Sequence, residues 1–279
     1  MDPVVFAAVL AAASMHAAWN AMVKVGLDRF SSIVLLALSS AFISLALLPF
    51  FAFPGSASWP WIVASALIHV GYKLALVRAY EHGDLSQVYP LARGTAPLIV
   101  AVVGAVFLGE TTTTAKLLAV AFIGLGVCLM SLRGGAVRPM PPKAFFYALV
   151  TAAFTASYTL VDGIGARLSG SASGYILAMG ILDGILVGAY ALSTRGPGIF
   201  ARLAPAWRSG FTVGALSLAS YWIVVWAFTR APIALVAALR ETSVLFAVLI
   251  AVVFLKERAG PSRIAAAALI TCGVVLMRV

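Results

Sequence analysis

Ten long runs of apolar residues constrain this sequence more than any other feature. Hydrophobic residues make up 63% of the chain and charged residues 10%, and the mean hydropathy is +1.06. A helix of about 20 apolar residues spans the ~30 Å hydrocarbon core of a bilayer. Continuous runs favour helices over a barrel of alternating strands. The sequence therefore predicts an all-α membrane protein with ten transmembrane helices, at residues 4–24, 31–51, 60–79, 86–108, 115–132, 144–162, 173–193, 210–229, 233–254 and 262–277.

Two parts of the chain are copies of one sequence. Residues 93–130 and 240–277 align without a gap at an offset of 147, and 14 of the 38 paired positions are identical. The alignment pairs Arg93 with Arg240 and Glu110 with Glu257. Each half then holds five helices, and because five is odd, the second half enters the membrane from the opposite side. We expect two inverted five-helix repeats, residues 1–133 and 144–279, joined by a Gly- and Pro-rich linker at residues 134–143.

Polar side chains inside the expected helices mark the candidate site, because hydrocarbon penalises them by about 3 kcal/mol or more. At helical spacing such side chains fall on one face, which would line a cavity. Polar groups that hold neighbouring helices together would give the same pattern. The stripes consist of His16, Trp19, Asn20 and Lys24 in the first helix and His69, Tyr72 and Lys73 in the third.

The two equivalent arginines are candidate anion ligands. Arg93 lies between two prolines that favour a kink or break in its helix. Broken helices near the bilayer centre bind anionic groups in transporters, and a guanidinium can clamp a carboxylate or phosphonate with two hydrogen bonds. The alternative is an internal ion pair, of Arg240 with Glu241 or of Arg93 with Asp162 or Asp183.

Asp162 and Asp183 lie within expected helices, where a carboxylate either carries a coupling proton or neutralises a nearby cation. The aromatic residues Tyr158 and Trp222 could form the walls of a site, and Tyr89 could donate a hydrogen bond. The predicted substrate-binding residues are Trp19, Asn20, His69, Tyr72, Lys73, Tyr89, Arg93, Tyr158, Trp222 and Arg240.

Other features exclude several classes of function. The net charge of +10 comes mostly from loop arginines, which favours contact with lipid headgroups over nucleic acid. The sequence has no Walker loop, His-Glu-x-x-His pair or Gly-x-Ser-x-Gly elbow, so we expect no enzyme, catalytic residue, metal or cofactor. Cys128 and Cys272 are not equivalent in the repeats and predict buried thiols. Loops after odd-numbered helices hold 12 Lys and Arg against 4 elsewhere, which predicts both termini outside the cytoplasm.

The sequence resembles the EamA family of the drug/metabolite transporter superfamily over essentially its whole length. The resemblance rests on the two halves, each with a Phe-Leu-x-Glu turn and a Gly-Val-x-Leu-Met tail (residues 107–130 and 254–277). Residues 15–20 (MHAAWN) and 88–94 (VYPLARG) also resemble a phosphonate-associated subgroup and, more loosely, YddG-like amino-acid exporters. The family implies a ten-helix basket around a central cavity. It also implies cytoplasmic termini, contrary to the loop charges.

These observations predict a multi-pass transporter of the bacterial inner membrane. The expected activity is export of small polar metabolites, most of all amino acids or related carboxylates, by alternating access or facilitation. Export of organic cations, drugs or phosphonates is the alternative, although the positive excess of Lys73, Arg93 and Arg240 disfavours cations. A membrane enzyme or lipid-handling subunit is an alternative of another class. The expected partners are a small-molecule substrate and the lipid bilayer, with the protein as a monomer or homodimer.

Overall fold

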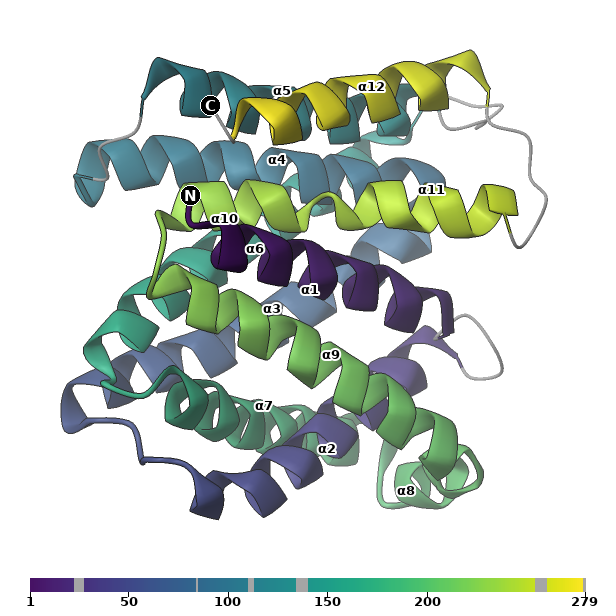
Figure 1. The fold of residues 1–279 in the computed structure, drawn as a ribbon. Coiled ribbons are helices and arrows are strands. Elements are labelled where there is room, and N and C mark those ends of the chain that lie inside the picture. The colour runs from purple at the N-terminus through teal and green to yellow at the C-terminus, as the bar shows by residue number, and fades with distance from the viewer. Residues whose placement is uncertain (23–27, 84, 110–112, 134–139, 254–259, 278–279) are drawn as a thin grey trace.

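The fold is built from helices, of which α4, α5, α11 and α12 run nearly parallel in the view of Figure 1, whereas α3 and α9 are inclined to them. The structure is a computed structural model, and it describes residues 1–22, 28–83, 85–109, 113–133, 140–253 and 260–277. Lys24, Glu110 and Glu257 lie outside the described residues. The first half contains α1 (Pro3–Met22), α2 (Arg29–Leu47), η1 (Leu48–Phe50), η2 (Ser56–Ser58), α3 (Trp59–His82), α4 (Leu85–Phe107) and α5 (Thr114–Arg133). The second half contains α6 (Pro142–Leu168), α7 (Ala172–Arg195), α8 (Gly198–Leu203), η3 (Ala204–Ala206), α9 (Trp207–Phe228), α10 (Ile233–Arg240), α11 (Ser243–Val253) and α12 (Pro261–Leu276).

The expected spans coincide with helices, with one difference in the second half. Seven helical stretches in the described ranges are long and apolar enough to cross a membrane, namely α1, α2, α3, α4, α6, α7 and the stretch Gly198–Phe228 that runs from α8 through η3 to α9. The helices α5 and α12 contain shorter apolar stretches. The expected single helix at residues 233–254 is two helices, because the backbone turns at Glu241 and Thr242 between α10 and α11.

Equivalent helices of the two halves pack against each other in opposite directions. Gly126 of α5 faces Ala266 and Ile270 of α12, whereas the equivalent Gly273 of α12 faces Ala119 and Ile123 of α5. A later position on one helix therefore meets an earlier position on the other, and the two helices are antiparallel. Both glycines let the backbones approach closely. Figure 1 shows this pair side by side along one edge of the fold.

The same relationship holds at the opposite edge of the fold, between α2 and α7. Gly180 of α7 lies against Ser44 of α2, and Gly184 lies against Ala41 and Ala37. The first helix of each half packs on the other half: α1 packs on α9, α10 and α11, and its counterpart α6 packs on α3 and α4. Such an exchange, together with antiparallel equivalent helices, is the pattern that inverted repeats produce.

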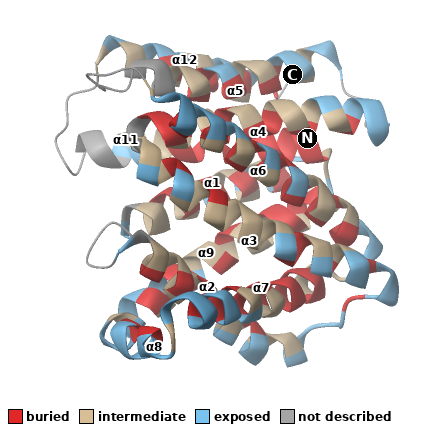
Figure 2. Ribbon diagram, turned by 180° about the vertical axis from the view of Figure 1, so that it is seen from behind, coloured by how far each residue is buried: buried red, intermediate tan, exposed pale blue. Residues whose placement is uncertain are grey.

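Buried residues gather on the faces that the helices turn toward one another, and exposed residues lie on their outward faces (Figure 2). The largest buried cluster includes Val9 of α1, Ile123 of α5, Phe228 of α9 and Leu239 of α10. Exposed outward residues such as Phe42, Val106 and Ile185 are apolar, as expected for a surface in contact with lipid. The two chain termini lie at the same end of the helices (Figure 1).

Candidate substrate-binding site

An ion pair between the halves lies at the centre of the candidate site. Arg93 Nε donates to Glu241 Oε2 at 2.9 Å, and Arg93 Nη2 lies 2.9 Å from Glu241 Oε1. Arg93 is on α4, and Glu241 is the residue that caps the end of α10. The two side chains are only 3% and 4% exposed. Arg93 therefore has an internal partner, although neither of the pairings expected for the two arginines forms.

Arg240, the repeat equivalent of Arg93, has a different environment. Its guanidinium carbon lies 4.8 Å from the centre of the Tyr221 ring, which places a cation over an aromatic face. The residue is 8% exposed, and its Nε is buried without a hydrogen-bond partner. No carboxylate among the described residues forms an ion pair with it. Arg240 is thus a buried cation with an unused donor.

Asp162 lies on the other side of Tyr221. Its carboxylate accepts hydrogen bonds from Tyr221 Oη at 2.5 Å and Tyr175 Oη at 2.9 Å, and the residue is fully buried. The ring of Tyr221 contacts Arg240 while its hydroxyl contacts Asp162. One tyrosine therefore links a buried cation to a buried anion.

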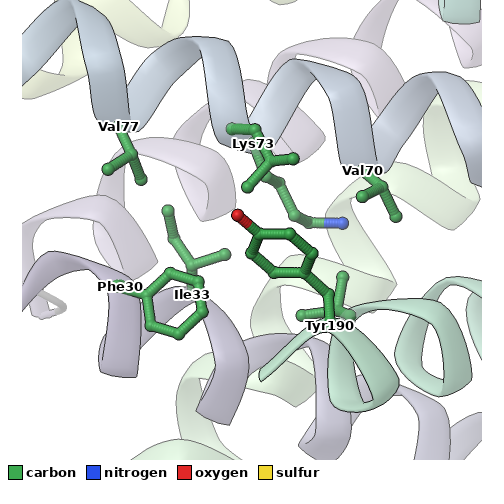
Figure 3. Close-up of a pocket in the computed structure, with 8 residues that line it drawn as sticks. Phe30, Ile33, Val70, Lys73, Val77 and Tyr190 are labelled. Atoms are coloured by element: carbon green, nitrogen blue, oxygen red, sulfur yellow. The ribbon is translucent and has the colours of Figure 1, made fainter. Parts of the chain in front are cut away.

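Lys73 and Asp183 form a second internal ion pair. Lys73 Nζ of α3 lies 2.5 Å from Asp183 Oδ1 of α7, and both side chains are mostly buried. The aliphatic stem of Lys73 lines a small apolar pocket with Phe30, Val70 and Tyr190, between α2, α3 and α7. Figure 3 shows the Lys73 side chain among these residues, with its ammonium on the side of Val70.

The polar stripe of α1 faces α4. His16 Nε2 lies 3.4 Å from Tyr89 Oη, and its ring packs edge-on against Trp19 with 4.9 Å between centres. Asn20 donates to the backbone carbonyl of His16. The indole Nε1 of Trp19 is buried and has no partner. Because Tyr89 also lies 5.9 Å from the Arg93 guanidinium, the stripe reaches the same centre as the arginines.

An aromatic group completes the centre from α3 and α6. His69 stacks on Tyr158 with 4.1 Å between ring centres, and Tyr72 packs edge-on against Tyr158 at 5.5 Å. Tyr221 packs against both His69 and Tyr158. Trp222 is separate from this group, because its ring packs on Phe51 and its Nε1 donates to Ser173 Oγ.

A small pocket adjoins the two arginine environments. It is formed by α4, α6 and α10. Its polar lining consists of Thr155, Thr159, Arg240 and Glu241. Both threonine hydroxyls donate to carbonyls one turn back in α6, so their oxygens can still accept hydrogen bonds from a ligand.

The charges of this centre are balanced. Across the described part of the chain, Lys73, Arg93 and Arg240 are accompanied by Asp162, Asp183 and Glu241. The positive excess expected from the sequence is therefore absent. Within this balance two pairs are in direct contact, and Arg240 and Asp162 are the charges that have no ion-pair partner.

Three contributors were not among the predicted substrate-binding residues. They are Glu241, which was expected only as a partner of Arg240, and the two tyrosines Tyr221 and Tyr175. The repeat alignment carried a signal for Glu241, because its equivalent is Gly94 and a carboxylate in only one copy indicates a special role. Tyr175 gives no such signal, since its contact with Asp162 depends on the packing of α6 and α7.

The arrangement of a polar centre inside two apolar repeats agrees with the comparison to protein families. The model of the EamA-like transporter family matches residues 4–132 and 142–279. The chain belongs to the EamA-like transporter family. It is therefore a multi-pass membrane protein of the drug/metabolite transporter superfamily, whose EamA members are transporters.

A solved structure shares the fold of this EamA-like protein. That structure, described as a crystal structure of a protein, superposes with a TM-score of 0.73 at 16% sequence identity, over 98% of this chain and 95% of the other. At this identity the likeness concerns the fold alone. A search of curated proteins gave no match.

Proposed function

We propose that this protein is an exporter of small polar metabolites in the bacterial inner membrane, with amino acids or related carboxylates as its main substrates. In this proposal ten transmembrane helices form two inverted repeats around the centre that contains Arg93 and Arg240. The repeats open the centre to one side of the membrane at a time. The protein works as a monomer or homodimer.

The environment of Arg240 is the observation that carries this proposal. A buried donor without a partner costs about 1–3 kcal/mol, and a buried charge without a counter-ion costs more. A substrate carboxylate would supply both the hydrogen-bond acceptor and the negative charge. The pocket beside Arg240 lies where α4 and α10 of opposite repeats meet α6, so relative motion of the repeats would change access to it.

The other predicted residues contribute to the proposed site in different ways. Arg93 and Lys73 already hold carboxylates of the protein, so they shape the site and its charge rather than provide the first contact. His69, Tyr72, Tyr89 and Tyr158 form the polar and aromatic wall. Asp162, which lacks an ion-pair partner, is a better candidate for a coupling proton than Asp183.

The test is transport by purified protein in liposomes, measured as counterflow and uptake of labelled amino acids with and without a proton gradient. We expect saturable flux that Arg240→Ala abolishes and Arg240→Lys partly retains. Arg195→Ala is the matched control, because Arg195 is a partly exposed arginine at the end of α7. Flux that persists in Arg240→Ala would refute this assignment. Faster loss of labelled substrate from cells that express the protein would support net export.

Organic cations are a second substrate class, favoured by one observation. Asp162 lies beside the aromatic residues Tyr158 and Tyr221, and rings next to a carboxylate can bind a cation. Flux of a quaternary ammonium dye that requires Asp162 and is unaffected by Arg240→Ala would favour this class over amino acids.

A further inference from the structure

Glu241 makes two otherwise equivalent arginines unequal. The repeat alignment pairs Arg93-Gly94-Thr95 with Arg240-Glu241-Thr242. The second copy thus carries a carboxylate where the first carries a hydrogen atom. One carboxylate accompanies two arginines at these equivalent positions, so only one of them can be neutralised locally.

The structure shows which arginine is neutralised. Glu241 does not pair with its neighbour Arg240 but reaches across to Arg93 on the other repeat, and both of its oxygens are engaged there. Glu241 lies at the interruption between the two helices, because it caps the end of α10 and stands in the turn that precedes α11. The Glu241 carboxylate holds Arg93 through one hydrogen bond from Nε and one ionic contact with Nη2, which forms no aligned hydrogen bond. It takes the place that a substrate carboxylate would occupy.

We propose that Glu241 is a specificity-determining residue that keeps Arg93 closed to substrate and leaves Arg240 as the single open guanidinium. The site then favours a substrate with one carboxylate whose charge is balanced by the substrate's own ammonium, as in a neutral amino acid. A substrate with a second anionic group is disfavoured. This inference rests on the proposed transport function and specifies its substrate class.

The charge balance supports this role. With Glu241 in place, the three cations and three carboxylates of the centre compensate one another, and a second substrate carboxylate would be buried without a partner. Removal of the Glu241 charge would leave Arg93 open beside Arg240. Two open guanidiniums within one buried site are the arrangement that recognises a dicarboxylate or phosphonate.

The experiment compares probes that differ by one charge and little in shape. Uptake of labelled glutamine and glutamate, and of asparagine and aspartate, is measured in liposomes for the wild type, Glu241→Gln and the double variant Arg93→Gln/Glu241→Gln. Asp28→Asn is the matched control, since it removes an exposed carboxylate at the start of α2. Size-exclusion profiles and ligand-induced thermal shifts with the same four probes accompany each variant.

We expect the wild type to prefer the amides, and Glu241→Gln to shift the amide-to-acid ratio toward the acids by about tenfold or more, as the gain of one charged hydrogen-bonded contact implies. The double variant, which removes both charges of the pair, should return the ratio to that of the wild type. A purely structural pair would lower the thermal midpoint without changing this ratio.

An unchanged ratio in Glu241→Gln, or a double variant that fails to restore it, would overturn the inference while the proposed function stands. The absence of both flux and thermal shift for all four probes in the wild type would instead overturn the proposed amino-acid transport, and the inference with it.

Discussion

The ammonium of Lys73 lies 2.5 Å from the carboxylate of Asp183, and this contact joins α3 to α7 inside the membrane domain. The two residues come from different repeats, 110 positions apart in the sequence. A charged pair in this position has more influence on stability than a pair in a loop, because neither charge can be compensated by water when its partner is removed.

Loss of either partner of this pair should destabilise the protein more than loss of both. We expect Lys73→Met and Asp183→Asn each to cost about 3 kcal/mol, since each leaves a mostly buried charge alone. The double variant should recover much of that loss. The thermal midpoint in detergent measures the effect, and Arg78→Met, which breaks an exposed pair with Glu81, should leave it nearly unchanged. Equal losses in the single and double variants would contradict the expectation.

The two tyrosines that donate to Asp162 should differ in function but not in stability. Tyr175→Phe and Tyr221→Phe each remove one hydrogen bond to a buried carboxylate, so we expect each to lower the unfolding free energy by about 1–3 kcal/mol. Only Tyr221 also contacts Arg240 with its ring, and Tyr221→Leu should therefore reduce transport further. Equal transport by Tyr221→Leu and Tyr221→Phe would show that the ring contact does not matter.

The glycines between α5 and α12 should be sensitive to any added side chain. In Gly126→Val and Gly273→Val the new atoms would meet the helix on the other side at Ala266 and Ala119, and we expect each change to cost about 1–3 kcal/mol through overpacking. Gly198→Ala is the control, because no atom lies near its added carbon. Thermal unfolding in detergent distinguishes them. Unchanged stability in both valine variants would show that the contact is looser than described.

Acid should weaken the link between the start of α2 and the end of α7. Partial burial alone would raise the pKa of Asp28, but hydrogen bonds from Ser31 and the Arg195 guanidinium outweigh it and hold this pKa below the ordinary value of 3.8. A lowered pKa in the folded state means that the contribution to stability is present above about pH 4 and disappears as pH falls below that value. The thermal midpoint between pH 5 and pH 3 should therefore fall more steeply in the wild type than in Asp28→Asn. Parallel profiles would contradict this link.

The helices could be predicted from the sequence because a bilayer leaves one solution for each long apolar run. The internal repeat also predicted which positions of the two halves are equivalent, because one constant offset aligns the whole stretch and pairs Arg93 with Arg240. The break at Glu241 was not predicted, because that segment lacks the proline pair that flanks Arg93 in α4. Local sequence favoured a break in the first copy, whereas the structure has it in the second.

The site was only partly predictable for a related reason. Helical spacing groups side chains of one helix, so His69 and Tyr72 could be assigned to one face. Spacing does not state which helix that face meets. The partners of Arg93, Lys73 and Asp162 all come from distant segments, and they depend on how the two repeats interlock rather than on any local pattern.

The antiparallel contact between α5 and α12 has a consequence for the history of the chain. Because Gly126 and Gly273 are equivalent residues that each pack on the other's helix, this contact has the self-complementary form of the interface in a twofold homodimer. Two separate copies of one half, inserted in opposite orientations, would meet through the same surface. The linker between the halves therefore fixes a single pairing, after which each copy was free to diverge, and a carboxylate at position 241 without a counterpart at position 94 is a difference that no symmetric dimer could hold.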